Sequence, residues 1–275
     1  MKTTKKNMFL LLVKHAIKNT WKWLIISNAL IIGIVTLASL FSKLLIHMKT
    51  SNFAIQMLTV VMVSTIVAAY IGAIVLLISV IVQNCYKSVF SDEGYLTFTL
   101  PISTNQLLIS RIVVNLMYAF FTFVCIFLSI IIAELLFEVN ILQFIYDIIS
   151  ILFVRPLLFV NVIVETIVYI IMYSYIILFA LSIANSAFKQ KNRIGLAILF
   201  YFIINAILST LQSAVMFLSF GFGYNVGGEL VFSFGLIGKV QGAYVINFTR
   251  FIFNALIVVG LHFATKYFLQ KKLEL

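Results

Sequence analysis

The group best suited to chemistry inside an apolar stretch of this chain is the carboxylate of Glu165. An ionised carboxylate facing lipid is very costly, so Glu165 is expected to face protein or a water-lined path. Asn161, Tyr169 and Tyr173 recur around it at four-residue spacing, which places all four residues on one face of a helix. This spacing predicts a polar stripe.

Two other apolar stretches carry comparable stripes. Their residues are Asn115, Tyr118, Thr122, Cys125 and Ser129 in one, and Tyr201, Asn205, Ser209 and Gln212 in the other. Stripes of this kind indicate either hydrogen bonding between helices inside a bundle or the wall of a transport path. Under the second interpretation, the path residues are Asn161, Glu165, Tyr169, Asn115, Tyr118 and Asn205.

Other chemistries find no support in the residue spacing. The three histidines lie in separate regions without a partner at i+3 or i+4, so no metal site is expected. Gly238-Lys239 is followed by Val240 rather than Ser or Thr, so the glycine-rich tract is not a P-loop. No nucleophile, base and orienting group occur together, which argues against an enzyme and leaves no catalytic residue to assign.

Composition identifies the solvent around these residues. Of the 275 residues, 63% are hydrophobic and 10% are charged, against about half and about a quarter in a soluble domain. Charged residues in this number cannot cover the surface of a soluble domain, and the medium around the chain is therefore lipid. The cysteines, Cys85 and Cys125, fall in a polar connection and in an apolar run, so a structural disulfide is not expected.

The elements that must position the stripes are membrane-spanning helices, each of which needs about 20 mostly apolar residues. Six stretches qualify, and the first is too long for a signal peptide. The sequence therefore predicts an all-α polytopic protein, a single transmembrane domain over 1–275, with spans at 23–42, 55–82, 108–133, 157–183, 194–220 and 245–268.

The basic residues indicate orientation. Six spans put both termini on one side, and 14 of the 19 Lys and Arg residues then fall on that side. The positive-inside rule makes it the cytoplasm, so we expect a multi-pass protein of the cell membrane with both termini cytoplasmic. These residues flank apolar runs and form no stripe with interleaved aromatics, so nucleic acid is not an expected partner.

Two segments outside the spans look amphipathic. Residues 7–22 place apolar side chains on one face and Lys14, Lys18 and Lys22 on another, which predicts a helix lying in the membrane surface. Residues 140–152 repeat the pattern on the outer side, where a plain extension of the third span is the alternative.

A glycine-rich segment precedes the last span. Seven of the twelve glycines fall within 221–242, among several aromatic residues. The segment is too apolar for an ordinary exposed loop and too rich in glycine for a helix, so a re-entrant or interfacial excursion over 221–244 is expected. An external loop without fixed structure is the alternative.

The connection over 83–111 is the most informative stretch. Ser103 to Gln106 has the form of a capping box, which predicts that the third long helix starts near Ser103, with Ile102 and Leu107 as a hydrophobic staple. Before Pro101, residues 91–100 are expected to form a short capped helix that exposes aromatic side chains. This segment is either a docking site for another protein or a capped turn between spans.

The run FSDEGYLTFTLP over 90–101, followed by Ser103 and Leu107, resembles the second cytoplasmic connection of permease subunits of type 2 ABC exporters of Gram-positive bacteria. The resemblance implies an amphipathic N-terminal helix, six spans and short re-entrant helices before the last span. It also implies a dimer with an identical or related permease and a cytoplasmic ATP-binding subunit that holds the ATP and Mg. In that family the connection seats on the ATPase. The coupling residues would here be Asp92, Glu93, Gly94, Tyr95, Phe98, Leu100 and Pro101.

The expected function is therefore that of a membrane-spanning exporter subunit that moves an unidentified peptide, drug or lipid-like substrate and holds no cofactor itself. Two alternatives come from other classes. One is an ion- or proton-coupled secondary transporter that uses Glu165, and the other is an intramembrane enzyme. Copurification with an ATPase would favour the exporter, whereas proton-coupled flux from the chain alone would favour the secondary transporter.

Overall fold

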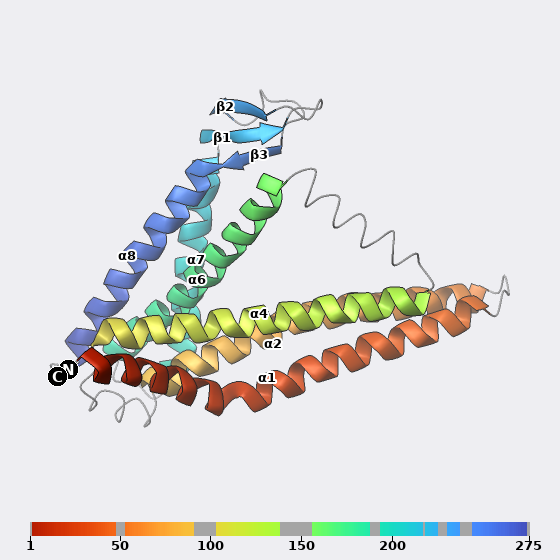
Figure 1. Ribbon diagram of the computed structural model, residues 1–275, viewed down its shortest axis with the longest axis horizontal. Helices are drawn as coiled ribbons and strands as arrows, with labels where there is room; N and C mark the ends of the chain where they lie inside the picture. The colour runs from red at the N-terminus through yellow and green to blue at the C-terminus, as the bar shows by residue number, and fades with distance from the viewer. Residues whose placement is uncertain are drawn as a thin grey trace. The chain divides into compact units, whose positions relative to one another are not determined.

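Six long helices form most of the chain (Figure 1). The computed structural model describes residues 2–47, 53–90, 103–137, 156–187, 193–216, 218–224, 230–236 and 244–273. Within these ranges the helices are α1 (Lys2–His47), α2 (Phe53–Phe90), α4 (Thr104–Phe137), α6 (Pro156–Ala187), α7 (Arg193–Met216) and α8 (Phe248–Leu273). The predicted interfacial helix over 140–152 lies outside the described residues.

Each helix contains a segment long and apolar enough to cross a membrane. These segments are Thr20–Leu45, Phe53–Tyr86, Thr104–Leu136, Val160–Asn185, Gly195–Val215 and Phe248–Gln270. All six overlap the predicted spans. The helices confirm the prediction of an all-α, multi-pass membrane protein. The helices form because lipid offers no hydrogen-bond partner, so runs of Leu, Ile, Val and Phe must satisfy their backbone N–H and C=O groups within the helix.

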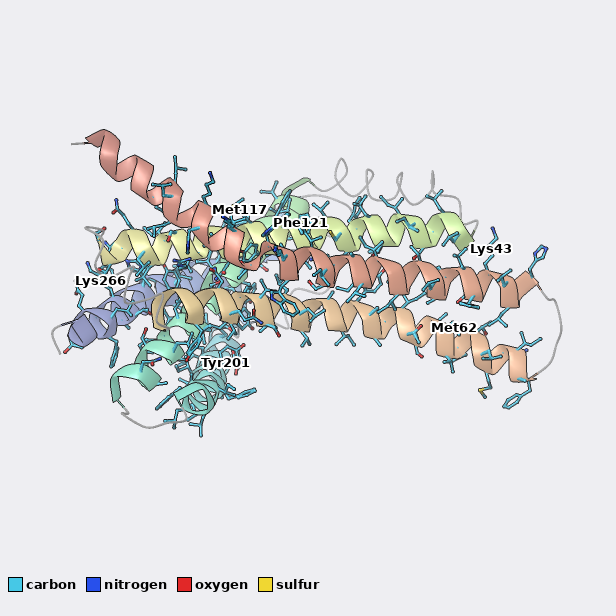
Figure 2. The ribbon with its side chains drawn as sticks, turned by 90° about the horizontal axis from the view of Figure 1, so that it is seen from below. Lys43, Met62, Met117, Phe121, Tyr201 and Lys266 are labelled. Atoms are coloured by element: carbon cyan, nitrogen blue, oxygen red, sulfur yellow. The ribbon has the colours of Figure 1, made fainter. Side chains whose placement is uncertain are left out.

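Several helices are longer than a bilayer is thick. The 46 residues of α1 extend about 69 Å at 1.5 Å per residue, whereas the hydrocarbon core is about 30 Å. The predicted helix over 7–22 is therefore the first part of α1 and not a separate element. Figure 2 shows that α1 bends, and Lys43 lies close to its far end. The Thr20 hydroxyl donates to the Ala16 carbonyl at 3.0 Å, a bond of the kind that often bends helices.

The chain divides into two compact units, and the prediction of a single transmembrane domain stays a prediction. The first unit contains residues 1–84 and 113–151, and the second contains residues 85–112 and 152–275. Helices α2 and α4 therefore contribute to both units.

Small and β-branched residues form one core cluster of the first unit. Ile31 and Val35 of α1 pack with Ala69 and Ala73 of α2, where the alanines allow a close approach of the two backbones. A second cluster brings Ala16 and Leu24 of α1 against residues of α2 and α4, namely Val80, Val114 and Tyr118. Ala16 belongs to the apolar face of residues 7–22, and it packs against protein here, while Lys14, Lys18 and Lys22 are exposed. The position of this segment in the membrane surface stays a prediction.

In the second unit α6 packs against both α7 and α8. Its buried residues include Met172, Ile176 and Leu178, and an edge-on ring contact joins Phe179 to Phe268 of α8. The outer side of α7 is exposed at Phe202 and other apolar residues, as expected for a face that meets lipid.

A small antiparallel sheet follows α7, in order β2-β1-β3. Its strands are β1 (Leu218–Tyr224), β2 (Leu230–Leu236) and β3 (Tyr244–Asn247), and β3 leads directly into α8 (Figure 1). The register places Phe220 opposite Phe234 and Phe222 opposite Phe232.

The strands replace the irregular backbone expected over 221–244, whereas the re-entrant or interfacial position of this segment stays a prediction. The sequence LSFGFGY alternates large apolar residues with Ser or Gly at period two, which is the pattern of a strand. Strand pairing satisfies the backbone hydrogen bonds that an irregular segment would leave to protein or water.

Candidate functional site

The polar stripe of α6 lies in the second unit, on a side of the helix that is only partly covered. The Asn161 side-chain amide donates a hydrogen bond of 3.3 Å to Oε1 of Glu165, and both residues are half-buried. Further along the stripe, the rings of Tyr169 and Tyr173 stack with centroids 6.3 Å apart. The predicted face therefore exists, with its carboxylate held by an amide one turn away.

A cation from α8 joins this stripe. The guanidinium carbon of Arg250 lies 5.3 Å from the centroid of the Tyr169 ring, which is a cation–π distance. The contact places a positive charge beside the aromatic part of a stripe whose other end carries Glu165. A pairing of this kind was not predicted, because residues 81 positions apart in sequence give no signal of their contact.

Glu165 lies nine residues after Pro156, where α6 begins, or about 14 Å along the helix. The residues between them are apolar apart from Asn161. A carboxylate at this position can bind a proton or a cationic group.

A second polar cluster in this unit lies between helices. The Gln212 amide of α7 donates to Asn254 Oδ1 of α8 at 2.8 Å and to the sulfur of Met172 at 3.4 Å. The Tyr175 hydroxyl lies 2.9 Å from Nδ1 of His262, and the two rings meet edge-on at 90°. These bonds tie α6, α7 and α8 together.

Sequence reasoning missed three members of this cluster. Tyr175, Asn254 and His262 do not belong to any predicted stripe, although Gln212 does. A histidine and an asparagine inside the last apolar segment are a signal by themselves, since such residues in a span almost always face the bundle interior.

The stripe of α4 lies in the first unit and is buried throughout. Asn115 is fully buried, and its Oδ1 accepts a 2.8 Å hydrogen bond from Asn84 of α2. The Tyr118 hydroxyl donates to the Ala16 carbonyl at 3.2 Å and also bonds to the Thr20 hydroxyl. These contacts support the interpretation of the α4 stripe as interhelical hydrogen bonding.

The stripe of α7 is less uniform. Asn205 is half-buried and has no hydrogen-bond partner among the described residues, whereas Ser209 is exposed. Of the six predicted path residues, Asn161 and Glu165 are joined to each other by a hydrogen bond. Asn115 and Tyr118 lie in the first unit, and the other four lie in the second.

The start of α4 confirms the predicted capping residue. The backbone N–H of Gln106 donates to Oγ of Ser103 at 3.4 Å, and that of Leu107 donates to the Ser103 carbonyl at 3.2 Å. The predicted coupling residues lie outside the described part of the chain: Asp92, Glu93, Gly94, Tyr95, Phe98, Leu100 and Pro101.

Within the described ranges, His, Cys, Asp and Glu residues form no group of three that could hold a metal ion, and the two cysteines are buried and not joined in a disulfide. No protein family matches this chain, and neither a curated protein nor a solved structure resembles it significantly.

Proposed function

We propose that this chain is the membrane-spanning permease subunit of an ATP-binding-cassette exporter. In this role it moves an unidentified peptide, drug or lipid-like substrate across the cell membrane, and a separate cytoplasmic subunit hydrolyses ATP. Six spans without a nucleotide-binding motif support a subunit that receives its energy from a partner. The resemblance of residues 90–107 to the coupling connection of such permeases supports the choice of partner.

The observation that carries this proposal is the position of that connection. Residues 91–102 join the end of α2 at Phe90 to the capped start of α4 at Ser103. Because this connection is short, a displacement of its surface by the ATPase would move the ends of both α2 and α4. Tyr95 and Phe98 would supply the buried aromatic contacts to the ATPase, with Asp92 and Glu93 at the rim.

The proposal includes a second permease chain, identical or related, and places both termini in the cytoplasm. Exposed apolar side chains along α2 and α7 offer ample surface for lipid and for another span. The positive-inside rule supports the orientation.

Isolation of the tagged chain from the membranes of its own cell, in a mild detergent, tests the proposal. We expect an ATPase with ATP-binding-cassette motifs to copurify in a fixed ratio and to hydrolyse ATP faster in the complex than alone. If the chain purifies without an ATPase and transports substrate by itself, the proposal is wrong.

The Asn161–Glu165 hydrogen bond favours a second candidate, a proton-coupled transporter, because it holds a carboxylate in a span with an amide donor. Reconstitution of the chain alone in liposomes with a pH gradient separates the two. The exporter account predicts no proton-linked flux from the wild type or from Glu165→Gln. Flux that is present in the wild type and in the neighbouring control Thr166→Val, but lost in Glu165→Gln, would support the second candidate.

A further inference from the structure

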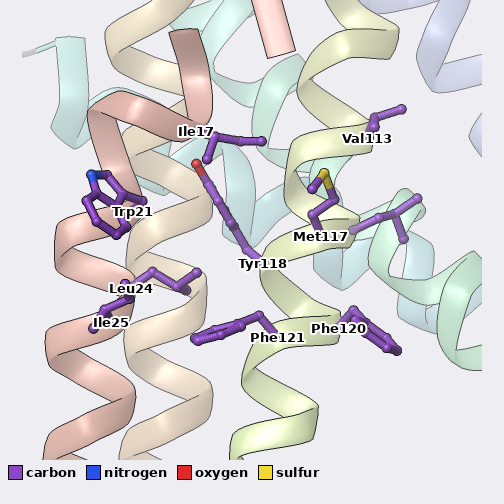
Figure 3. A pocket seen from close by; sticks show the side chains of 10 residues that line it. Ile17, Trp21, Leu24, Ile25, Val113, Met117, Tyr118, Phe120 and Phe121 are labelled. Carbon is purple, nitrogen blue, oxygen red and sulfur yellow. The ribbon is translucent and has the colours of Figure 1, made fainter. Parts of the chain in front are cut away.

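An apolar groove opens between α1 and α4 in the first unit. Its volume is about 570 Å³, within the range of sites that hold small molecules. In Figure 3, Trp21 and Phe121 are seen on the two helices that form its walls. The lining that matters for the argument is Ile17, Trp21 and Ile25 from α1, and Met117, Phe120 and Phe121 from α4.

Lysines lie on the same side of α1 at the N-terminal end of the groove, one before and one after the lining residue Ile17. Lys14 precedes Trp21 by seven residues and Lys18 precedes Ile25 by seven, which is two helical turns, or about 10 Å. Both lysine side chains are exposed. The first 91 residues contain no Asp or Glu, so no acidic residue of α1 or α2 neutralises them.

Trp21 indicates how deep in the membrane the N-terminal end of the groove lies. Its side chain is 46% exposed at the start of the apolar segment, which begins at Thr20. Tryptophan is enriched where a span meets the headgroup layer. The groove therefore extends from the interface into the hydrocarbon, with the lysines on the headgroup side.

We propose that the groove binds one acyl chain of an anionic phospholipid, whose phosphate lies at Lys14 and Lys18. The apolar lining suits a hydrocarbon chain, and exposed lysines next to a span attract anionic headgroups. A zwitterionic lipid fits the groove equally well but gains less from the lysines, because its amine offsets its phosphate. This lipid is a bound component of the protein, so the inference goes beyond the proposed function and does not depend on an ATPase.

The two tryptophans of the chain, Trp21 and Trp23, allow a matched test. Trp23→Phe leaves the groove tryptophan as the only indole. Trp21→Phe leaves Trp23, which is 61% exposed at nearly the same depth but points about 200° away around the helix. Each variant is reconstituted in vesicles of phosphatidylcholine and phosphatidylglycerol in which one lipid carries acyl-chain bromine, and fluorescence quenching gives the preference for each lipid.

We expect Trp21 to prefer phosphatidylglycerol about 25-fold more strongly than Trp23 does, about fivefold for each of the two lysines. Lys14→Gln and Lys18→Gln, each in the Trp23→Phe background, should each lower the preference by about fivefold, equivalent to about 1 kcal/mol. With both lysines replaced, Trp21 should show the same preference for phosphatidylglycerol as Trp23. These surface changes leave the packed side of α1 intact, so folding is not expected to change.

Three outcomes would overturn the proposal. The first is an equal preference for phosphatidylglycerol at Trp21 and Trp23. This result would mean that the lysines attract anionic lipid to this part of the surface without directing it into the groove. The second is an unchanged preference in the double lysine variant. The third is that neither brominated lipid quenches Trp21 and that the Ile25→Cys variant forms cross-links between two chains. This result would mean that a second copy of the protein, and not a lipid, fills the groove.

Discussion

The side-chain amide of Asn84 donates a 2.8 Å hydrogen bond to Oδ1 of Asn115. The bond joins α2 to α4, and the two residues are 3% and 0% exposed. Hydrogen bonds between spans contribute about 0.6 kcal/mol on average and up to about 1.7 kcal/mol. Asn115, which the sequence offered as a path residue, therefore holds two helices together.

Asn115→Ala should destabilise the protein by about 1–2 kcal/mol, because the interhelical bond is lost and a buried amide must find another partner. Unfolding in mixed micelles with increasing SDS measures the change. Ser209→Ala on α7 is the control, since its exposed hydroxyl bonds only to the Ala206 carbonyl of its own helix. Equal stability of the two variants would contradict the structural role of Asn115.

The contact between Tyr175 and His262 should be visible as a coupling free energy. A double-mutant cycle with Tyr175→Phe and His262→Phe removes the hydrogen bond but keeps the ring volumes close to the original. We expect a coupling of about 0.6–1.7 kcal/mol in the same unfolding assay. Tyr173→Phe in place of Tyr175→Phe should give a coupling near zero, because Tyr173 is 40% exposed and stacks on Tyr169 instead. A cycle at Tyr175 that also gives zero would mean that this bond does not hold α6 to α8.

The spans could be predicted because their signal is local. Length and hydropathy alone define a segment such as Phe53–Tyr86, and the Ser103 cap depends on a pattern only four residues long. The stripe of α4 was also readable, since its spacing predicted a buried face and Asn115 and Tyr118 are buried. In each case the information lies within one helix.

Contacts between distant segments could not be predicted in the same way. No rule of spacing relates Arg250 to Tyr169 or Tyr175 to His262, because these pairs depend on how α8 packs on α6. The sheet was missed for another reason. Strands β1 and β2 do alternate at period two, but the number of glycines over 221–242 favoured an interpretation as irregular backbone.

Cysteine accessibility tests the orientation. Single cysteines near Lys2, Lys189 and Lys272 should react only from the cytoplasm, and those near Asn52, Asn140 and Asn225 only from outside. The expectation follows from the distribution of 14 of the 19 basic residues. Cys85 and Cys125 are both buried, so their replacement by alanine gives a suitable background. Labelling of positions 190 and 225 from the same side of intact cells would contradict six spans.

The central claim is that residues 91–100 seat on an ATPase, and its most direct test is copurification of that ATPase with the Tyr95→Ala and Phe98→Ala double variant. Buried aromatic contacts at an interface are worth about 2 kcal/mol or more, so each substitution should weaken association roughly 30-fold. Thr97→Ala with Thr99→Ala changes the same segment without removing aromatic area and should leave association intact. We predict that the aromatic double variant inserts normally and loses both the bound ATPase and its stimulated ATP turnover. Normal association and normal turnover with both aromatic residues removed would contradict the account.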